Sequence, residues 1–441
     1  MRVMFAASEA MPLVKTGGLA DVVGALPKAL AKLGVEVTVV LPKYGEIPQA
    51  IAETVKTIAV TDVQLGWRRQ YCGIQETTVD GVRFLLVDNE FYFKRGYLYG
   101  YGDEAERFAF FSFAVMEVLD KLERLPDILH CHDWQTGLIP FLLKTRYANR
   151  PGYRDIRTVF TIHNLQYQGV FSRDLLQDLL STGDDSFTQD SLEFYGAASC
   201  MKAGLRFADK LSTVSYTYSF EIQTEQYGEK LDGVIRERSH DLWGILNGID
   251  TEVYDPMSDP HLVQNYRLSL DKKRANKLAL QRELGLPEDG EVPLIGIVSR
   301  LTAQKGFDLI AEAMPELMKM RIQLVVLGSG EPGIEAMLRE ALLANRDKIA
   351  LWFGFNEGLA RRIYAASDMY LMPSRFEPCG LSQLIALRYR SVPIVRETGG
   401  LKDTVEPYNE YTGTGTGFTF GSPTAHDMLY TIRRALNRVQ H

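Results

Sequence analysis

Two cations stand close together in the second half of the chain. Arg300 and Lys305 follow the apolar run 293–298, which has the composition of a buried strand. The loop after a parallel strand lies at the sheet edge where such folds bind ligands, so two fixed cations there suit a diphosphate leaving group. The chain has no Asp-x-Asp pair to hold a metal on a sugar nucleotide, so these cations and helix N-termini have to supply the positive charge. The alternative is a pair of surface charges.

A glycine turn near the N-terminus indicates a second anion site. Lys15-Thr-Gly-Gly18 stands between the apolar run 3–7 and a helical pattern that has Asp21 in its first turn. Apolar residues then recur at three- and four-residue spacing up to Leu33, and Gly34 follows where a helix ends. Backbone N–H groups at a helix N-terminus, with Lys15 beside them, favour a phosphate. The alternative is a tight turn with a solvated lysine.

A carboxylate and a second glycine pair follow two later apolar runs. Glu377 comes after the run 369–372, and Thr398-Gly-Gly400 comes after the run 392–395. The carboxylate can bind sugar hydroxyls or stabilise an oxocarbenium-like carbon, and the glycine turn offers amide donors to an anion. The alternative for Glu377 is a carboxylate that complements a helix dipole. Cys379 is interpreted as structural, because no histidine lies near it in sequence to activate it.

Two histidine-containing segments in the first half also follow apolar runs. They are His130-Cys-His-Asp-Trp134 and Thr161-Ile-His-Asn164. A His-x-His pair could bind a metal, but Asp133 and Trp134 fit a carbohydrate site better, with a carboxylate for hydroxyls and an aromatic face for a sugar ring or a core. His163 is the stronger candidate, because polar residues follow it directly. The alternative for His163 is a buried core histidine.

One motif is interpreted against its usual meaning. Gly328-Ser-Gly330-Glu-Pro-Gly333 has the Gly-x-Gly-x-x-Gly spacing of dinucleotide-binding folds. It lies in the middle of its domain rather than in the first βα unit, and the acidic residue about 20 positions on, Asp347, does not end a strand. We therefore do not expect a nicotinamide cofactor. The glycines allow backbone to approach a ligand, or they simply form a tight turn.

Short apolar runs alternate with helical patterns along the chain, which predicts an α/β fold of parallel sheets with helical crossovers. The expected strands are 3–7, 35–41, 82–86, 128–131, 158–162 and 210–214 in the first half, and 293–298, 322–327, 349–353, 369–372 and 392–395 in the second. The pattern pauses at 244–250, so we predict an N-terminal domain over 1–245 and a C-terminal domain over 246–441. Ligand loops then lie at the carboxyl ends of the strands, and the expected site is a cleft between the domains.

Composition narrows the class of partner. The chain has 441 residues, 46% of them hydrophobic, and a formal charge of −7, which argues against nucleic acid or an anionic membrane as the main partner. Its four cysteines are widely spaced, which suggests free thiols in a reducing compartment. No signal or membrane span is recognisable. We expect a cytoplasmic protein, or a plastid stromal protein whose transit peptide has been removed.

Taken together, these segments closely resemble the bacterial glycogen synthases and plant starch synthases. The resemblance runs from residue 1 to about 430 and rests on 15–21, 130–134, 161–164 with 167–171, 244–250, 299–301 with 304–306, 374–380 and 398–401. It implies a GT-B glycosyltransferase of two Rossmann-like open parallel-sheet domains facing each other across a deep cleft. The implied activity is transfer of glucose from ADP-glucose to the non-reducing end of an α-1,4-glucan, such as glycogen or starch, with retention of configuration.

The resemblance also implies residue roles. Arg300 and Lys305 would stabilise the departing diphosphate, Glu377 would hold the transferred glucose, and His163 would line its pocket. The implied substrate-binding residues are Lys15, Gly17, Gly18, Asp21, Asp133, Asn247, Ser299, Gln304, Gly328, Gly330, Phe355, Cys379, Gly380, Leu381, Thr398, Gly399 and Gly400, with Phe355 beside the adenine. No metal and no cofactor apart from the nucleotide-sugar substrate are expected.

Two departures from the family pattern stand out. Arg390 occupies a position where the family usually has glycine, and the chain reaches His441 before the terminal helix that usually returns to the first domain. We therefore expect that helix to be shortened or absent. Two alternative functions stay open on the sequence. One is the same fold with UDP-glucose as donor or a small sugar as acceptor, and the other is a catalytically inactive glucan-binding homologue.

Overall fold

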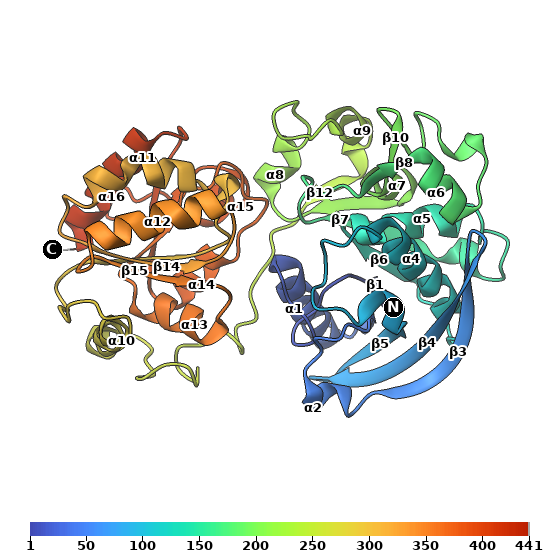
Figure 1. The fold of residues 1–441 in the computed structure, drawn as a ribbon, viewed down its shortest axis with the longest axis horizontal. Helices are drawn as coiled ribbons and strands as arrows, with labels where there is room; N and C mark the ends of the chain where they lie inside the picture. Colours follow the sequence, from blue (N-terminus) through green and yellow to red (C-terminus); the bar gives the residue numbers. More distant parts are fainter. Residues whose placement is uncertain (440–441) are drawn as a thin grey trace. The chain divides into compact units, whose positions relative to one another are not determined.

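The computed structural model describes residues 1–439. The chain forms two compact units, which meet after Leu246 in the sequence (Figure 1). The division falls one residue from the boundary expected from sequence. Each unit contains its own sheet and its own hydrophobic core.

The first unit is built on one large twisted sheet. The strand order is β12-β11-β7-β6-β1-β2-β5-β4-β3. The bounds are β1 Arg2–Ala6, β2 Glu36–Pro42, β3 Lys56–Leu65, β4 Arg68–Val79, β5 Val82–Asp88, β6 Ile128–His132, β7 Arg157–Ile162, β11 Lys210–Thr213 and β12 Leu242–Gly244. A small separate sheet pairs β8 (Val170–Ser172), β10 (Ala197–Ser199) and β9 (Glu193–Phe194).

All the strands expected in the first half are confirmed to within a few residues, and they pair in parallel where they are neighbours. The hairpin of β3 and β4 was not expected, and it extends the sheet by antiparallel pairing with β5. Much of β3 faces solvent, so its sequence lacks the continuous apolar run that identifies a buried strand.

Helices cover the first sheet. They are α1 Gly18–Lys32, α2 Gln49–Ala52, α3 Glu90–Phe93, α4 Glu104–Asp120, α5 Leu138–Lys144, α6 Arg173–Leu180, α7 Cys200–Phe207, α8 Tyr216–Glu221 and α9 Asp232–Glu237. The expected helix after the glycine turn is α1, and Gly34 just beyond it has φ of +81°, the left-handed conformation that ends many helices. Pro27 lies in the interior of α1.

The second unit is a parallel sheet in the order β15-β14-β13-β16-β17-β18. The bounds are β13 Leu294–Val298, β14 Gln323–Gly328, β15 Ile349–Phe353, β16 Met369–Met372, β17 Val392–Arg396 and β18 Phe418–Phe420. Every strand expected in the second half is confirmed, and β18 was missed because three residues are too short to form a pattern.

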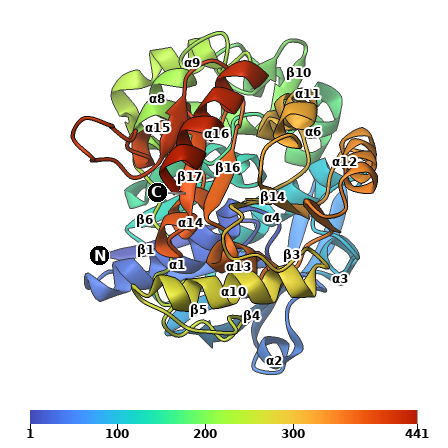
Figure 2. The same cartoon turned by 90° about the vertical axis from the view of Figure 1, so that its left-hand side faces the viewer.

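Both faces of this second sheet are buried. The helices are α10 Leu270–Glu283, α11 Phe307–Leu317, α12 Pro332–Ala344, α13 Glu357–Ala366, α14 Ser382–Arg388, α15 Gly399–Thr404 and α16 Ala425–Val439. Ile295 and Ile297 of β13 point into a core with α11, α12 and α16, whereas Leu294 points into another core with α10 and α13. Figure 2 shows α16, which packs on β17 and β18. This alternation within an apolar strand is typical of a sheet covered on both sides.

The Arg390 departure has a visible backbone consequence. Arg390 lies just after α14 and adopts φ of +61°, in the left-handed region. Glycine enters this region at no steric cost, whereas a residue with a Cβ is strained there. Glycine is therefore sterically favoured at this position, but this chain has arginine there.

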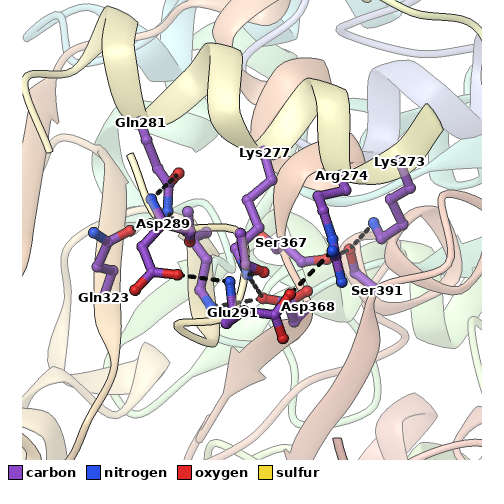
Figure 3. Close-up of polar contacts among 12 residues, drawn as sticks. Lys273, Arg274, Lys277, Gln281, Asp289, Glu291, Gln323, Ser367, Asp368 and Ser391 are labelled. Carbon is purple, nitrogen blue, oxygen red and sulfur yellow. Dashed lines mark hydrogen bonds and ion pairs between the residues drawn. The ribbon is translucent and has the colours of Figure 1, made fainter. Parts of the chain in front are cut away.

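Buried amines attach α10 to the amino-terminal edge of the second sheet (Figure 3). Lys277 forms an ion pair with Asp368 at 2.7 Å, and the same Asp368 oxygen accepts the Leu294 backbone N–H at 2.8 Å. Lys273 donates to the carbonyls of Ala365 at 2.8 Å and Tyr389 at 3.0 Å. Burial lowers the pKa of Lys273 to about 7. These contacts hold α10, the helix that precedes β13, against the second sheet.

The Lys277–Asp368 pair gives a stability prediction. Lys277→Met should lower the free energy of unfolding of the second unit by about 3 kcal/mol, because a carboxylate that is three-quarters buried then loses its buried cation. Urea denaturation measures the change. Lys272→Met, an exposed lysine on the same helix, is the matched control and should change stability by less than about 0.5 kcal/mol. Equal denaturation midpoints for the two variants would contradict the assigned role of the pair.

Candidate functional site

The topology of the second sheet places its ligand loops. β13 lies between β14 and β16, so the chain leaves β13 toward one edge of the sheet and later returns to its other side. Parallel sheets bind ligands at such a reversal, beyond the carboxyl ends of the strands. The two loops that adjoin there are 299–306 after β13 and 373–381 after β16. They carry the cations and the carboxylate singled out from sequence.

Lys305 and Glu377 meet at this point. The Lys305 ammonium contacts both Glu377 carboxylate oxygens, at 2.9 and 2.7 Å. The Ser374 hydroxyl donates to the same carboxylate at 3.0 Å. Both side chains of the pair are largely buried, with 17% and 8% of each exposed. Glu377 is thus bound by specific partners, and the alternative of a carboxylate that only complements a helix dipole does not describe it.

Arg396 holds the carboxylate loop in place, and sequence reasoning missed it. Its buried guanidinium at the end of β17 donates to the carbonyls of Ser374 at 2.8 Å and Gly421 at 3.1 Å, and also to the carbonyl of Arg375. The loop also donates a bond of its own, from the Arg375 N–H to the Gln304 carbonyl at 2.8 Å. The only signal in the sequence was a cation ending an apolar strand.

The glycine pair after β17 packs backbone against backbone. A Cβ on Gly399 would lie 1.9 Å from the Glu377 carbonyl oxygen, and one on Gly400 would lie 2.1 Å from that of Cys379. The Gly400 N–H donates to the Glu377 carbonyl at 3.1 Å. Thr398 before them is buried and serves as the N-cap position of α15. The structure thus brings 398–400 and 377–379 together, as the sequence prediction of one shared site requires.

The glycines after β14 have a steric function as well. A Cβ on Gly328 would lie 1.8 Å from the Ser299 carbonyl oxygen, and one on Gly330 would lie 2.2 Å from that of Leu301. Leu301 and Gly330 also form a β-bridge. The Gly-x-Gly spacing therefore serves the packing of the 299–301 loop.

The remaining predicted residues of the second unit lie around these loops. Gln304 accepts a bond from Arg300 at 3.4 Å. Cys379 is buried, burial raises the pKa of its thiol to about 12, and the Asn247 backbone hydrogen-bonds to it, so it is inert as a nucleophile. Gly380 has φ of +71°, Leu381 is the N-cap position of α14, and Phe355 is largely exposed in the loop after β15.

The first unit has a reversal of the same kind between β1 and β6. Asp133 directly follows β6 with φ of +58°, and its carboxylate accepts the backbone N–H groups of His163 at 2.7 Å and Asn164 at 3.4 Å. Burial, with a smaller contribution from the nearby Glu9 charge, raises the pKa of Asp133 to about 7, although the two backbone hydrogen bonds lower it. Asp133 thus fixes the backbone at His163, the other residue of this unit predicted to line the sugar pocket.

The histidine rings are paired and neutral. His132 Nδ1 and His163 Nε2 are 2.9 Å apart, and His130 Nε2 lies 2.6 Å from the Thr161 hydroxyl. Burial lowers the pKa of His130 to about 4 and of His163 to about 3. His163 still keeps part of its surface exposed. The alternative of a core histidine therefore fits His132, which is 1% exposed, better than His163.

Trp134 belongs to the core. Its ring packs edge-on against Phe108 at 5.2 Å and Phe171 at 5.6 Å. Gly169 approaches the same ring so closely that a Cβ there would lie 2.2 Å from it. Of the two functions that the sequence allowed for this aromatic face, packing in the core is the one observed.

The glycine turn before α1 holds an anion that the sequence analysis did not foresee. The backbone N–H groups of Thr16 and Gly17 donate to the carboxylate of Glu9, at 2.6 and 3.1 Å. Lys15 forms an ion pair with Asp21 at 2.9 Å, and Gly18 begins α1. The expectation that these amides face an external anion is therefore corrected for Thr16 and Gly17. Contact of Lys15 or Gly18 with a phosphate stays a prediction.

Among residues 1–439, no group of three or more His, Cys, Asp or Glu side chains is placed to hold a metal ion. Within the same residues, no helix has the length and apolarity needed to cross a membrane.

Comparison with known proteins identifies the class. Residues 2–237 match the family model of the starch synthase catalytic domain, and residues 281–439 match the model of glycosyl transferases group 1. With these matches and two Rossmann-like units, the chain has the GT-B fold. A sucrose-phosphate synthase from Thermosynechococcus elongatus, 18% identical with a TM-score of 0.61, shares that fold.

More similar proteins define the family. Glycogen synthases from Desulforamulus reducens and Geobacillus stearothermophilus are 55% and 54% identical, over 99% of this chain and 91% and 90% of theirs. The catalytic domain of starch synthase IV from Arabidopsis thaliana, bound to ADP and acarbose, is 35% identical with a TM-score of 0.93, over 100% of this chain and 92% of that one. The chain belongs to the glycogen and starch synthase family of glycosyltransferases.

The close contact between the 398–400 turn and the 377–379 backbone predicts that a side chain at position 400 impairs activity. Gly400→Ala should lower glycosyl transfer by about 10²-fold, because its Cβ would displace the backbone of Cys379 and with it Glu377. Steady-state kinetics measures the loss. Gly421→Ala is the matched control, since a Cβ there meets nothing within 4 Å. Wild-type rates in Gly400→Ala would show that the loop contact does not position the site.

Proposed function

We propose that this chain transfers glucose from ADP-glucose to the non-reducing end of an α-1,4-glucan, with retention of configuration. The observation that carries the proposal is the Lys305–Glu377 pair at the strand reversal of the second sheet. A cation for a leaving diphosphate and a carboxylate for a sugar are the two charges that such a transfer requires. Family membership supports the donor and the glucan acceptor.

Lys305 is proposed to stabilise the departing diphosphate. An ammonium has three N–H donors, and two of them are directed at the Glu377 oxygens. The third is available to a phosphate oxygen without breaking the pair. Arg300 supplies the second cation, and the amides after Thr398 supply neutral donors at the start of α15.

Glu377 is proposed to bind the hydroxyls of the transferred glucose. Its carboxylate is oriented by Lys305 and Ser374, so it can accept hydrogen bonds from a sugar without moving. His163 and Asp133 are proposed to line the pocket of that sugar or the path of the acceptor. Lys15 and Gly18 are proposed to contact the phosphates of the nucleotide sugar.

The transfer is proposed to need no metal, because fixed cations and helix amides stabilise the leaving group. We also place the enzyme in a reducing compartment such as the cytoplasm. Cys72, Cys131, Cys200 and Cys379 are all buried free thiols, which supports that location.

The donor is tested by direct comparison. Purified protein should incorporate glucose into glycogen from ADP-glucose, with the same rate after treatment with EDTA, and more slowly from UDP-glucose at equal concentration. Release of the nucleoside diphosphate with and without glycogen is the measurement. Faster turnover of UDP-glucose would replace the proposed donor. Glycogen binding without any diphosphate release would support the inactive glucan-binding alternative instead.

The role of Lys305 has its own test. Lys305→Ala should lower kcat by about 10²–10³-fold, the usual cost of removing a group that stabilises charge in the transition state. The control is Lys319→Ala, because Lys319 lies on the surface of the same unit and should leave kcat unchanged. Full activity of Lys305→Ala would rule out the proposed role.

A further inference from the structure

Glu9 is a buried carboxylate whose partners are all neutral. It lies three residues beyond the end of β1, with 4% of its surface exposed. One carboxylate oxygen accepts the N–H groups of Thr16 at 2.6 Å and Gly17 at 3.1 Å. The other accepts the hydroxyls of Thr16 at 2.7 Å and Tyr99 at 2.8 Å. Four hydrogen bonds thus replace the water that the carboxylate loses on burial.

The carboxylate occupies the start of a helix. Gly17 is the N-cap position of α1, and no side-chain hydrogen bond from the cap itself satisfies the first turn. The first N–H groups of a helix have no partner within the helix, and the helix dipole favours an anion beside them. Glu9 therefore places its charge beside the N-terminus of α1, bound to the N–H of the N-cap residue and of the residue before it, and it joins β1 to the turn that precedes α1.

Further contacts hold the same loop. The Met11 N–H donates to the Ala20 carbonyl at 2.9 Å, so the loop is also bound to the first turn of α1. A Cβ on Gly24 would lie 2.8 Å from the Met11 carbonyl oxygen, which shows how closely helix and loop pack. Lys15 is held by Asp21 at 2.9 Å. The position of the lysine is therefore set by a chain of bonds in which Glu9 is the buried member.

We propose that Glu9 is a positioning residue for glucosyl transfer, which fixes the Lys15–Gly18 turn through the amides of Thr16 and Gly17 so that Lys15 and the Gly18 amide are presented to the nucleotide-sugar phosphates. The proposal rests on the proposed function in that it takes this turn to contact the donor. Glu9 itself touches neither substrate, and its effect on the reaction passes through the turn.

Glutamine at position 9 can make the same four contacts. Its amide oxygen accepts the two backbone N–H groups, and its NH2 group donates to the two hydroxyls, which reverse their role. Tyr99 can then donate to the Ser8 hydroxyl, 2.8 Å away, and the exposed Thr16 hydroxyl can donate to water. Glu9→Gln therefore preserves the geometry and removes the charge. Glu9→Ala and Glu9→Asp remove the reach of the side chain.

The experiment combines hydrogen exchange with kinetics. In Glu9→Ala the Thr16 and Gly17 amides should exchange faster than in the wild type, and kcat/KM for the nucleotide sugar should fall by about 10²-fold, since a displacement of about 1 Å is enough for that loss. KM for glycogen should not change. Glu9→Gln should keep the wild-type exchange and stay within about tenfold in kcat/KM, because neutral hydrogen bonds replace charge-assisted ones of about twice the strength.

Tyr99→Phe is the matched control. It removes one of the four bonds but leaves both amides bound, so exchange at Thr16 and Gly17 should stay as in the wild type. If Glu9→Ala does not fold, Glu9→Asp takes its place with the same expected losses. Hydrogen exchange does not require activity, so this test is still decisive if neither nucleotide sugar is turned over.

Three outcomes would overturn the proposal. Wild-type exchange and kinetics in both Glu9→Ala and Glu9→Asp would show that the turn is fixed without Glu9. A Glu9→Gln variant as impaired as Glu9→Ala would show that the charge matters and the hydrogen-bond geometry does not. An equal loss in Tyr99→Phe would move the role to the tyrosine.

Discussion

Parallel pairing of strands is the constraint on which this structure depends. Strands that run in parallel end at the same sheet edge, so the loops that follow them are brought together whatever their separation in sequence. In the second unit this joins Lys305 to Glu377 across 72 positions of the chain. In the first unit it brings Asp133 close enough to Glu9 for the charge of Glu9 to raise the pKa of Asp133.

A second constraint follows from the first. Loops gathered at a buried edge carry charges that water does not reach, so each charge needs a partner within the protein. Lys305 and Glu377 satisfy each other, and Glu9 is satisfied by amides and hydroxyls alone. Such a site is ordered by its own bonds before any ligand is considered. A phosphate or sugar then has to add to these bonds or exchange with them, which favours groups whose hydrogen-bonding geometry matches.

The sequence was sufficient for the elements with a strong periodic signal. The buried parallel strands are continuous apolar runs, and every one of those predicted is present. Much of β3 faces solvent and has no such run, so the hairpin of β3 and β4 was missed. Placing residues after strands was enough to predict that Glu377 and Lys305 share an edge. The sequence could not predict that these two side chains touch. It also could not predict that Arg396 holds the loop that carries Glu377, because a bond from a side chain to a distant carbonyl leaves no pattern in sequence.

The glycines show why the partners of a motif matter more than its spacing. Gly328 and Gly330 match a phosphate-binding spacing, yet carbonyl oxygens of Ser299 and Leu301 fill the space where their side chains would be. Gly399 and Gly400 make a similar close approach, but to the backbone that carries Glu377. At Gly17 a Cβ would meet nothing within 4 Å, and the N–H there binds a carboxylate. Of the three turns, only the one at Gly17 is open beside the residue. Its amide binds a carboxylate, as does the amide of Gly330, which donates to Glu335 at 3.2 Å. The chemistry that a glycine turn offers is therefore decided by which atoms lie within reach of its backbone.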